Sequence, residues 1–374
     1  MLSEAHYSFC LRCDVETILE WREMYGVTTL VLAASLLVGG LFGWLAERSD
    51  YCARSAYDEI FSLTSRTGRG QLNQLWQIAI AGISAIIAIL IARQLELFDI
   101  EQARQFKAPL NLVGLFLGTL LFGIGMGLSR GCVSRLIVLS GRGNIRALIT
   151  LVFLSLFAWS AISGVLAVPR ITIASLGQIE YSPTLSHSLF AIWVLLLLVA
   201  VVLVMWRGGA NQPVKRALMA ASIGLLVPAC FFVTAVIGAD EFDPIPVEGL
   251  RFILPVADSL GYFVYSTALT PKFGLGLVGG AFIGTILSAK LSGRIVIEGF
   301  NNAPHPLRYI LGAFFMSFGG VIAGGCTVGW LLTGGSVLNG GVLIAFAGFG
   351  LGNLSLRLPF INGFLDKETV TSSV

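Results

Sequence analysis

G-I-G-M-G-L-S-R-G-C, residues 123–132, closes a long apolar run of the chain with glycines and a cysteine. A second stretch of the same character, F-G-G-V-I-A-G-G-C, occupies residues 318–326. Alignment of Cys132 with Cys326 also aligns three pairs of glycines: Gly125 with Gly319, Gly131 with Gly325 and Gly141 with Gly335. Matching interrupted segments in the two halves of a membrane protein indicate the binding site of a transporter. A thiol at both interruptions favours sulfur chemistry or sulfur recognition.

The composition of the 374-residue chain is that of a membrane protein. Hydrophobic residues make up 56% and charged residues 12%, and the mean hydropathy of +0.84 is too high for an ordinary soluble domain. A helix of about 20 apolar residues crosses the hydrocarbon core of a bilayer. About nine runs are long enough to be membrane spans: 27–46, 74–93, 110–129, 147–168, 188–206, 216–238, 273–289, 307–323 and 341–357. The chain is therefore predicted to be an all-α polytopic membrane protein.

The apolar runs and the paired cysteine stretches divide the chain into five parts. We expect two membrane repeats, joined by connecting spans and a loop, with a tail at each end. The boundaries are N-terminal tail 1–26, first membrane repeat 27–168, connecting spans and loop 169–270, second membrane repeat 271–357 and C-terminal tail 358–374. Internal repeats of this kind are common in secondary transporters.

Basic residues in the connections predict the orientation of the chain. Most of the 24 Lys and Arg residues fall on the side opposite to the N-terminus, and basic residues favour the cytoplasmic side. The N-terminus is therefore expected outside and the C-terminus in the cytoplasm. Cys132 then lies in a cytoplasmic connection and Cys326 in an outer one, as an inverted repeat requires. The net charge of +3 reflects this topology rather than nucleic-acid binding, because no basic stretch is interleaved with stacking aromatic residues.

A second internal similarity disagrees with this scheme. Residues 39–52, which end in Cys52, resemble residues 279–292, yet the span count makes both segments cross the membrane in the same direction. Either this similarity is a coincidence, or the segment between Gly238 and Lys272 contains a further membrane pass. The cysteine stretches agree at more of their special positions, so the inverted repeat is preferred.

A short apolar piece follows each of the paired cysteines. Val133 to Leu139 and Thr327 to Leu332 are too short to cross a bilayer at 1.5 Å per residue. We expect them to be re-entrant half-helices that line a cavity at the membrane midplane. Their N–H groups and positive dipole ends would face a small anion, and the adjacent Gly131 and Gly325 would let the backbone approach it. The alternative is that both pieces are glycine-rich loops.

Four motifs carry a family resemblance: R-S-D-Y-C-A-R-S-A-Y-D-E at 48–59, S-R-G-C-V-S-R-L at 129–136, S-A-K-L-S-G-R at 288–294 and A-G-G-C-T-V-G at 323–329. With these motifs the chain resembles the YeeE/YedE family of bacterial membrane proteins. The resemblance implies an hourglass-shaped inner-membrane permease with internal inverted repeats that takes up thiosulfate or a related sulfur compound. It also implies that three cysteines on a central path, here Cys52, Cys132 and Cys326, pass the ion inward through S–H···S hydrogen bonds. A sulfur-carrier protein of the TusA type often accompanies such proteins, which suggests a cytoplasmic partner in addition to membrane lipid.

Basic residues near these motifs are candidates for binding the anion. Arg130 and Arg135 flank Cys132 in the sequence and add positive charge beside it. Three further basic residues adjoin the repeated segments and are expected to attract the anion into a vestibule: Arg48, Lys290 and Arg294. Their expected partners are Asp58, Glu59 and Glu298. The alternative is that these charges are paired and only structural.

The remaining cysteines and the histidines do not indicate a metal or cofactor site. Cys10 and Cys13 form C-L-R-C without a second ligand pair, so they stay unassigned. Cys230 lies within the apolar run V-P-A-C-F-F and is expected to be an inert core residue. The three histidines are far apart in the sequence. We therefore expect no metal and no cofactor.

Two other functions would use the same residues. A membrane thiol exchanger would pass sulfane sulfur or disulfide bonds covalently, and it would need an attacking thiolate and a resolving partner. A general anion or water channel would contain the cysteines only incidentally. Transport without catalysis is the preferred hypothesis, because a neutral thiol is a weak and polarizable hydrogen-bonding group that an anion can leave again.

Overall fold

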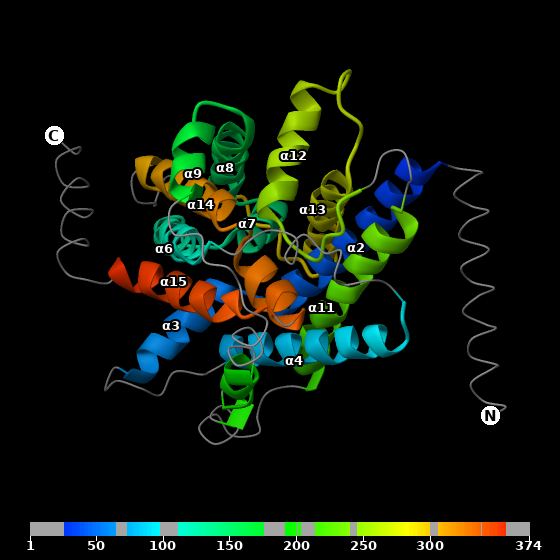
Figure 1. Ribbon diagram of the computed structural model, residues 1–374, viewed down its shortest axis with the longest axis vertical. Coiled ribbons are helices and arrows are strands. Elements are labelled where there is room, and N and C mark those ends of the chain that lie inside the picture. Colours follow the sequence, from blue (N-terminus) through cyan, green and yellow to red (C-terminus); the bar gives the residue numbers. More distant parts are fainter. Residues whose placement is uncertain are drawn as a thin grey trace.

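The computed structural model describes residues 26–64, 73–97, 111–175, 191–199, 201–202, 214–239, 245–299, 306–337 and 339–356. These residues pack as helices (Figure 1), and the extended pairing among them is a single bridge between Asn144 and Glu298. The helices are α2 (Val27–Ser49), α3 (Ala53–Thr64), α4 (Asn73–Gln94), α6 (Leu112–Leu128), α7 (Val133–Gly141), α8 (Ile145–Ser163), α9 (Ala167–Ser175), α11 (Val214–Phe232), η2 (Val233–Ile237), α12 (Ile253–Val264), α13 (Phe273–Leu291), α14 (Pro306–Ile322), η3 (Gly329–Gly334) and α15 (Gly341–Ser355). The predicted all-α class is confirmed.

Six helical segments of the described chain are long and apolar enough to cross a membrane. They are Val27–Phe61, Asn73–Gln94, Leu112–Gly141, Ile145–Ser163, Val214–Ile237 and Phe273–Leu291. The expected spans 307–323 and 341–357 appear as the shorter apolar helices α14 and α15, and the expected span 188–206 lies partly outside the described residues. The chain is therefore a multi-pass membrane protein, while its hourglass outline stays a prediction.

α12 is a helix that the apolar runs did not predict. It lies in the segment between Gly238 and Lys272, where a further membrane pass was one explanation of the second internal similarity. Its 12 residues extend over about 18 Å at 1.5 Å per residue, which is too short for a complete crossing. The helix packs against α8 and α13 instead.

α2 and α13 lie side by side (Figure 1), and the order of their facing residues shows that they run in the same direction. Along their contact, Gly39 of α2 faces Leu277 of α13, and Gly43 faces Ala281 one turn later. A Cβ atom would lie 2.1 Å from the carbonyl oxygen of Leu277 if placed on Gly39, and 2.0 Å from that of Ala281 if placed on Gly43. The glycines therefore let the two backbones touch. The parallel direction agrees with the span count, so the similarity of 39–52 to 279–292 requires no further pass.

α6 and α14, which lead to the paired cysteines, run in opposite directions. Gly118 near the start of α6 faces Gly319 near the end of α14, whereas Gly125 near the end of α6 faces Gly312 near the start of α14. Cβ atoms at these glycines would lie within 3.0 Å of the facing backbone. This antiparallel pair is the arrangement expected of an inverted repeat.

The two antiparallel helices end with the same backbone turn. The chain leaves α6 through Arg130 (φ 58°) and leaves α14 through Gly324 (φ 69°), both in the left-handed region. Two backbone hydrogen bonds close each turn: Ser129 N to Gly125 O (3.0 Å) and Gly131 N to Met126 O (3.1 Å) after α6, and Ala323 N to Gly319 O (2.9 Å) and Gly325 N to Gly320 O (3.0 Å) after α14. These bonds join equivalent positions of the two aligned stretches, so the repeat extends to the backbone geometry that places each cysteine.

Candidate functional site

Each of the paired cysteines stands directly before a short helix. α7 begins after Cys132, and a helix over 327–336, which includes η3, begins after Cys326. Most residues of α7 and all residues of η3 are buried. The expectation of two short helices at 133–139 and 327–332 is confirmed, with each helix a few residues longer than expected. The loop alternative is wrong for both pieces.

The N-termini of these two helices have equivalent geometry. Leu136 N donates to Cys132 O over 2.9 Å, and Trp330 N donates to Cys326 O over 2.9 Å. Cys132 makes no side-chain capping bond to the first turn of α7. The first N–H groups of a helix have no intrahelical acceptor, so they form a site where an anion is favoured.

The three cysteines of the expected path gather around Tyr51. Cys52, Cys132 and Cys326 are buried free thiols, and Tyr51 is only 3% exposed. The Tyr51 side chain lies within electrostatic interaction range of all three, and Cys52 lies within range of Cys132. The structure therefore brings together residues separated by up to 275 positions, since the chain numbers run from 51 to 326. Sequence reasoning missed Tyr51, although its place next to Cys52 was a signal.

Neighbouring polar groups hold the thiols in place. Cys132 Sγ lies 3.2 Å from Ser134 Oγ, and either atom can donate. The backbone N–H of Cys52 donates to Gln74 Oε1 over 3.0 Å, which ties the turn between α2 and α3 to the start of α4. Gln74 N in turn donates to Glu59 Oε1 over 3.0 Å. The Cys52 turn is thus fixed by side chains from two other helices.

A group of charged residues lies beside Cys52 at the C-terminal end of α2. Arg135 of α7 pairs with Asp50 (3.4 Å) and lies within electrostatic interaction range of Cys52. Arg142 and Arg294 pair with the same carboxylate. Arg135, expected beside Cys132, thus lies near Cys52, and its role in binding an anion stays a prediction.

A second arginine, which sequence reasoning missed, lies beside Cys326. Gly329 occupies the position that corresponds to Arg135 when the cysteines are aligned. A Cβ atom on Gly329 would lie 3.1 Å from Cβ of Arg251 and 3.9 Å from Sγ of Cys326, so Arg251 packs where a side chain at this position would begin. Arg251 is buried and forms an ion pair with Glu248. One arginine–carboxylate pair, Arg135 with Asp50, therefore lies near Cys52, and Arg251, which pairs with Glu248, packs near Cys326.

Residues 48–355, which include all three path cysteines, match the family described as Sulphur transport. This chain belongs to that family. The expected YeeE/YedE membership is confirmed, and the family is one of transport proteins rather than enzymes.

Two curated relatives of this Sulphur transport family member cover most of its length. The thiosulfate transporter TsuA of Spirochaeta thermophila is 26% identical over 341 residues, which cover 86% of this chain and 96% of the relative. The thiosulfate transporter TsuA of Escherichia coli is 24% identical over 322 residues, which cover 80% of this chain and 86% of the relative. Both similarities therefore extend over at least 80% of this chain.

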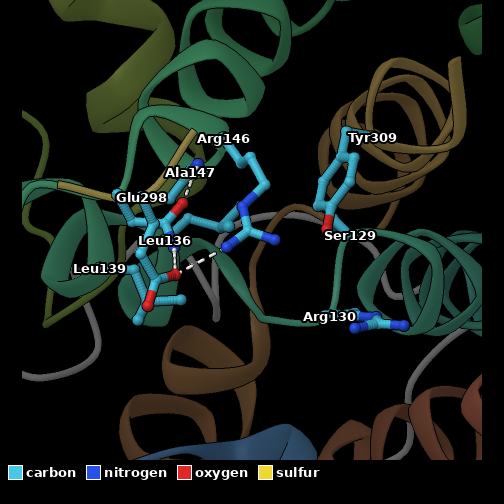
Figure 2. Close-up of a pocket in the computed structure, with 9 residues that line it drawn as sticks. Ser129, Arg130, Leu136, Leu139, Arg146, Ala147, Glu298 and Tyr309 are labelled. Atoms are coloured by element: carbon cyan, nitrogen blue, oxygen red, sulfur yellow. Dashed lines mark hydrogen bonds and ion pairs between the residues drawn. The ribbon is translucent and has the colours of Figure 1, made fainter. Parts of the chain in front are cut away.

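Arg130 of this family member lines a cavity that does not include the path cysteines. The cavity has a volume of about 240 Å³ and lies between the α6–α7 turn, α7, and the starts of α8 and α14. Figure 2 shows the residues that line it, with Arg146 facing Glu298. Arg146 and Glu298 form an ion pair of 2.7 Å. Arg130 and Tyr309 also line the cavity, and the three path cysteines do not. The structure thus separates Arg130 from Arg135, although both are close to Cys132 in the sequence.

The structure also places the three residues expected to form the vestibule, Arg48, Lys290 and Arg294, in different surroundings. Arg294 belongs to the charged group beside Asp50, whereas the guanidinium of Arg48 lies 5.3 Å from the ring centroid of Trp44. Lys290 is exposed near the C-terminus of α13. Glu298 pairs with Arg146 rather than with the vestibule residues expected for it.

The other cysteines fall outside the site. Cys230 is fully buried in α11, as an inert core residue would be, and Cys10 and Cys13 lie outside the described residues. Within the described part of the chain, no group of three His, Cys, Asp or Glu side chains is placed to hold a metal ion.

Proposed function

We propose that this protein is an inner-membrane permease that imports a small sulfur-containing anion, thiosulfate, along the path of Cys52, Cys132 and Cys326. The observation that carries the proposal is that three buried thiols lie within electrostatic interaction range of Tyr51, with Arg135 in range of Cys52 and Arg251 packed near Cys326. Membership of the Sulphur transport family and the names of both relatives support a sulfur anion as the cargo.

The thiols suit a sulfur anion because they bind it weakly. A thiol is a weak hydrogen-bond donor and acceptor with a polarizable sulfur, so it can pair with the terminal sulfur of thiosulfate. Conduction requires sites that are favourable enough to bind the ion and weak enough to release it. Three thiols from different segments provide such successive sites. Under the proposed orientation the ion passes from Cys326, near Arg251, to Cys132 and Cys52, near Arg135.

The short helices after Cys132 and Cys326 add fixed positive potential to the path. A helix N-terminus carries about half a positive charge and presents N–H groups to an anion. Gly131 and Gly325 precede the cysteines, and neither has a side chain between the backbone and the ion. The proposed roles of the predicted residues are thus donor thiols, backbone approach at the glycines, and attraction by Arg135.

The proposed orientation in the membrane follows from the charge distribution of the chain. We place the N-terminus outside and the C-terminus in the cytoplasm, because most basic residues lie in the connections of the cytoplasmic side. A sulfur-carrier protein of the TusA type is the proposed cytoplasmic partner, and membrane lipid surrounds the apolar helices. No cofactor takes part in the proposed mechanism.

Growth on thiosulfate tests the function. A bacterium without its own sulfur importers, supplied with thiosulfate as its sole sulfur source, is expected to grow when it expresses this protein. Cys132→Ala or Cys326→Ala should abolish growth at equal membrane abundance, because each removes one thiol site. Cys230→Ala is the matched control, since it removes a buried cysteine that lies away from the path. Growth that is unchanged by both path variants would reject the cysteine path.

Serine variants separate hydrogen bonding from covalent exchange. Cys132→Ser keeps a donor but loses the sulfur, so a hydrogen-bond path should retain slow uptake in proteoliposomes, whereas covalent sulfur exchange should stop. Mass spectrometry of the wild-type protein after turnover is the second test, because it detects covalent sulfur adducts on the cysteines. A persulfide or mixed disulfide on Cys52, Cys132 or Cys326 would support the exchange mechanism instead.

A further inference from the structure

Three guanidinium groups converge on one carboxylate at the C-terminal end of α2. Asp50 Oδ1 lies 2.6 Å from Arg142 Nη2 and 3.4 Å from Arg135 Nη1, and Asp50 Oδ2 lies 3.4 Å from Arg294 Nη1. The arginines come from α7 with its C-terminal cap and from the segment after α13, so these two parts of the chain meet the end of α2 here. We call Arg135, Arg142 and Arg294 the arginine cluster.

A second carboxylate holds part of the arginine cluster in place. The side chain of Glu47 is 0% exposed, and its Oε1 lies 3.1 Å from Arg142 Nη2 and 3.6 Å from Arg294 Nη1. Its Oε2 accepts a hydrogen bond of 2.7 Å from Ser288. A buried carboxylate with these partners is a fixed structural anion, because breaking the pairs would leave its charge desolvated. The three cations of the cluster thus face two carboxylates.

Asp50 is more easily displaced from the arginine cluster than Glu47. Its side chain is 40% exposed, so its carboxylate can exchange arginines for water at a lower cost than the buried Glu47. Among the described residues Asp50 is the only carboxylate that pairs with Arg135, whereas Arg142 and Arg294 keep Glu47 as a second partner. Displacement of Asp50 would therefore free the charge of Arg135 and leave the other two arginines held.

The arginine cluster lies at the cysteine path. Asp50 stands two residues before Cys52, and Arg135 stands three residues after Cys132. Arg135 also lies within electrostatic interaction range of Cys52. The guanidinium of Arg135 is therefore close enough to act electrostatically on an anion bound at Cys52.

We propose that the arginine cluster is an anion subsite at the end of the cysteine path, that Asp50 is its resident carboxylate, and that the transported sulfur oxyanion takes the place of Asp50 at Arg135. This inference rests on the proposed function. A guanidinium fork fits two oxygens of an oxyanion as well as those of a carboxylate, so the two compete directly. The competition lowers the affinity of the subsite, and return of Asp50 to Arg135 helps the ion to depart.

Asp50 can be neutralised without a change of backbone. It occupies a left-handed conformation (φ 55°), which asparagine adopts readily. Asp50→Asn therefore removes the charge and keeps the turn. Glu298→Gln is the matched control, because it removes an exposed carboxylate that pairs with Arg146 outside the arginine cluster.

The first measurement is uptake of radiolabelled thiosulfate into proteoliposomes by the wild type, Asp50→Asn, Arg135→Gln and the double variant. Asp50→Asn is expected to lower the half-saturating concentration about tenfold and to lower the maximal rate, since release becomes slow. Arg135→Gln is expected to raise the half-saturating concentration. In the double variant the effect of Asp50→Asn should disappear, because the two residues act as one unit. Thermal unfolding confirms that each variant is folded.

The second measurement is binding of thiosulfate to the purified protein in detergent, with the same four proteins. A gain in affinity from Asp50→Asn that needs Arg135 supports the subsite. An equal change in thiosulfate affinity in Asp50→Asn and Glu298→Gln would overturn the proposed subsite. The same change in affinity with and without Arg135 would also overturn it. Absence of wild-type uptake would reject the proposed function alone, since the binding titration still decides the competition between Asp50 and the anion.

Discussion

The side chain of Tyr51 is buried within electrostatic interaction range of Cys52, Cys132 and Cys326. A phenol is a stronger hydrogen-bond donor than a thiol, and a sulfur oxyanion that contacts thiols through its sulfur still has oxygens to satisfy. Tyr51 is therefore the candidate donor to an oxygen of the ion. In this reading the thiols recognise sulfur and the tyrosine recognises oxygen.

Tyr51→Phe is expected to slow thiosulfate uptake about tenfold, because a hydrogen bond to a charged group contributes about 1.5–3 kcal/mol and the ring that fills the site is kept. Uptake into proteoliposomes measures the effect. Tyr57→Phe is the control, since its hydroxyl donates to Phe346 O (3.2 Å) and the variant should keep the wild-type half-saturating concentration. Equal behaviour of both variants would remove Tyr51 from the path.

At the scale of helices, glycines determine how closely α2 and α13 approach. The helices touch through backbone atoms at Gly39 and Gly43, and the charged group beside Cys52 lies where both helices end. Their contact therefore sets the distance between Asp50 on one side and Arg294 on the other. A wider contact would pull this ion pair apart.

Gly39→Ala is expected to destabilise the protein by about 1–3 kcal/mol, because its Cβ would lie 2.1 Å from the carbonyl oxygen of Leu277 and the helices must separate. Gly279→Ala in α13 is the matched control, since no atom lies within 4 Å of its Cβ and alanine favours the helix. Thermal unfolding in detergent measures both. A Gly39→Ala protein as stable as Gly279→Ala would contradict the close contact.

Most of the helices could be predicted from the sequence, because a span needs an uninterrupted apolar run and this signal is local. α12 was missed because its 12 residues are too few for a span. The paired cysteines were found through their repeated glycines, whereas Tyr51 and Arg251 carry no repeat. Arg251 reaches Cys326 across 75 residues of chain, and only tertiary packing reveals such a contact.

At the scale of the whole molecule, α13 connects the two proposed sides of the membrane. Its 19 residues extend over about 28 Å, from exposed Lys272 at the N-terminal end towards Glu298 beyond the C-terminal end. The proposed orientation places the C-terminal ends of α2 and α13, and with them the arginine cluster, on the cytoplasmic side.

Labelling with a membrane-impermeant maleimide tests this orientation. Lys272→Cys should react in intact cells, and Glu298→Cys should react only after the membrane is permeabilised, because the basic end is expected inside. The wild type gives the background, since its described cysteines are buried. The reverse pattern would invert the proposed topology.

The two arginine–carboxylate pairs differ in their hydration. Asp50 beside Arg135 is 40% exposed, whereas the side chains of Arg251 and Glu248 are 4% and 15% exposed. An ion that arrives from one side exchanges with a wet carboxylate, and an ion that arrives from the other side meets a pair that is costly to separate. Such unequal ends cannot create net flow by themselves, because detailed balance leaves its direction to the gradient. They do mean that the anion concentration needed to occupy the path differs between the two faces of the protein.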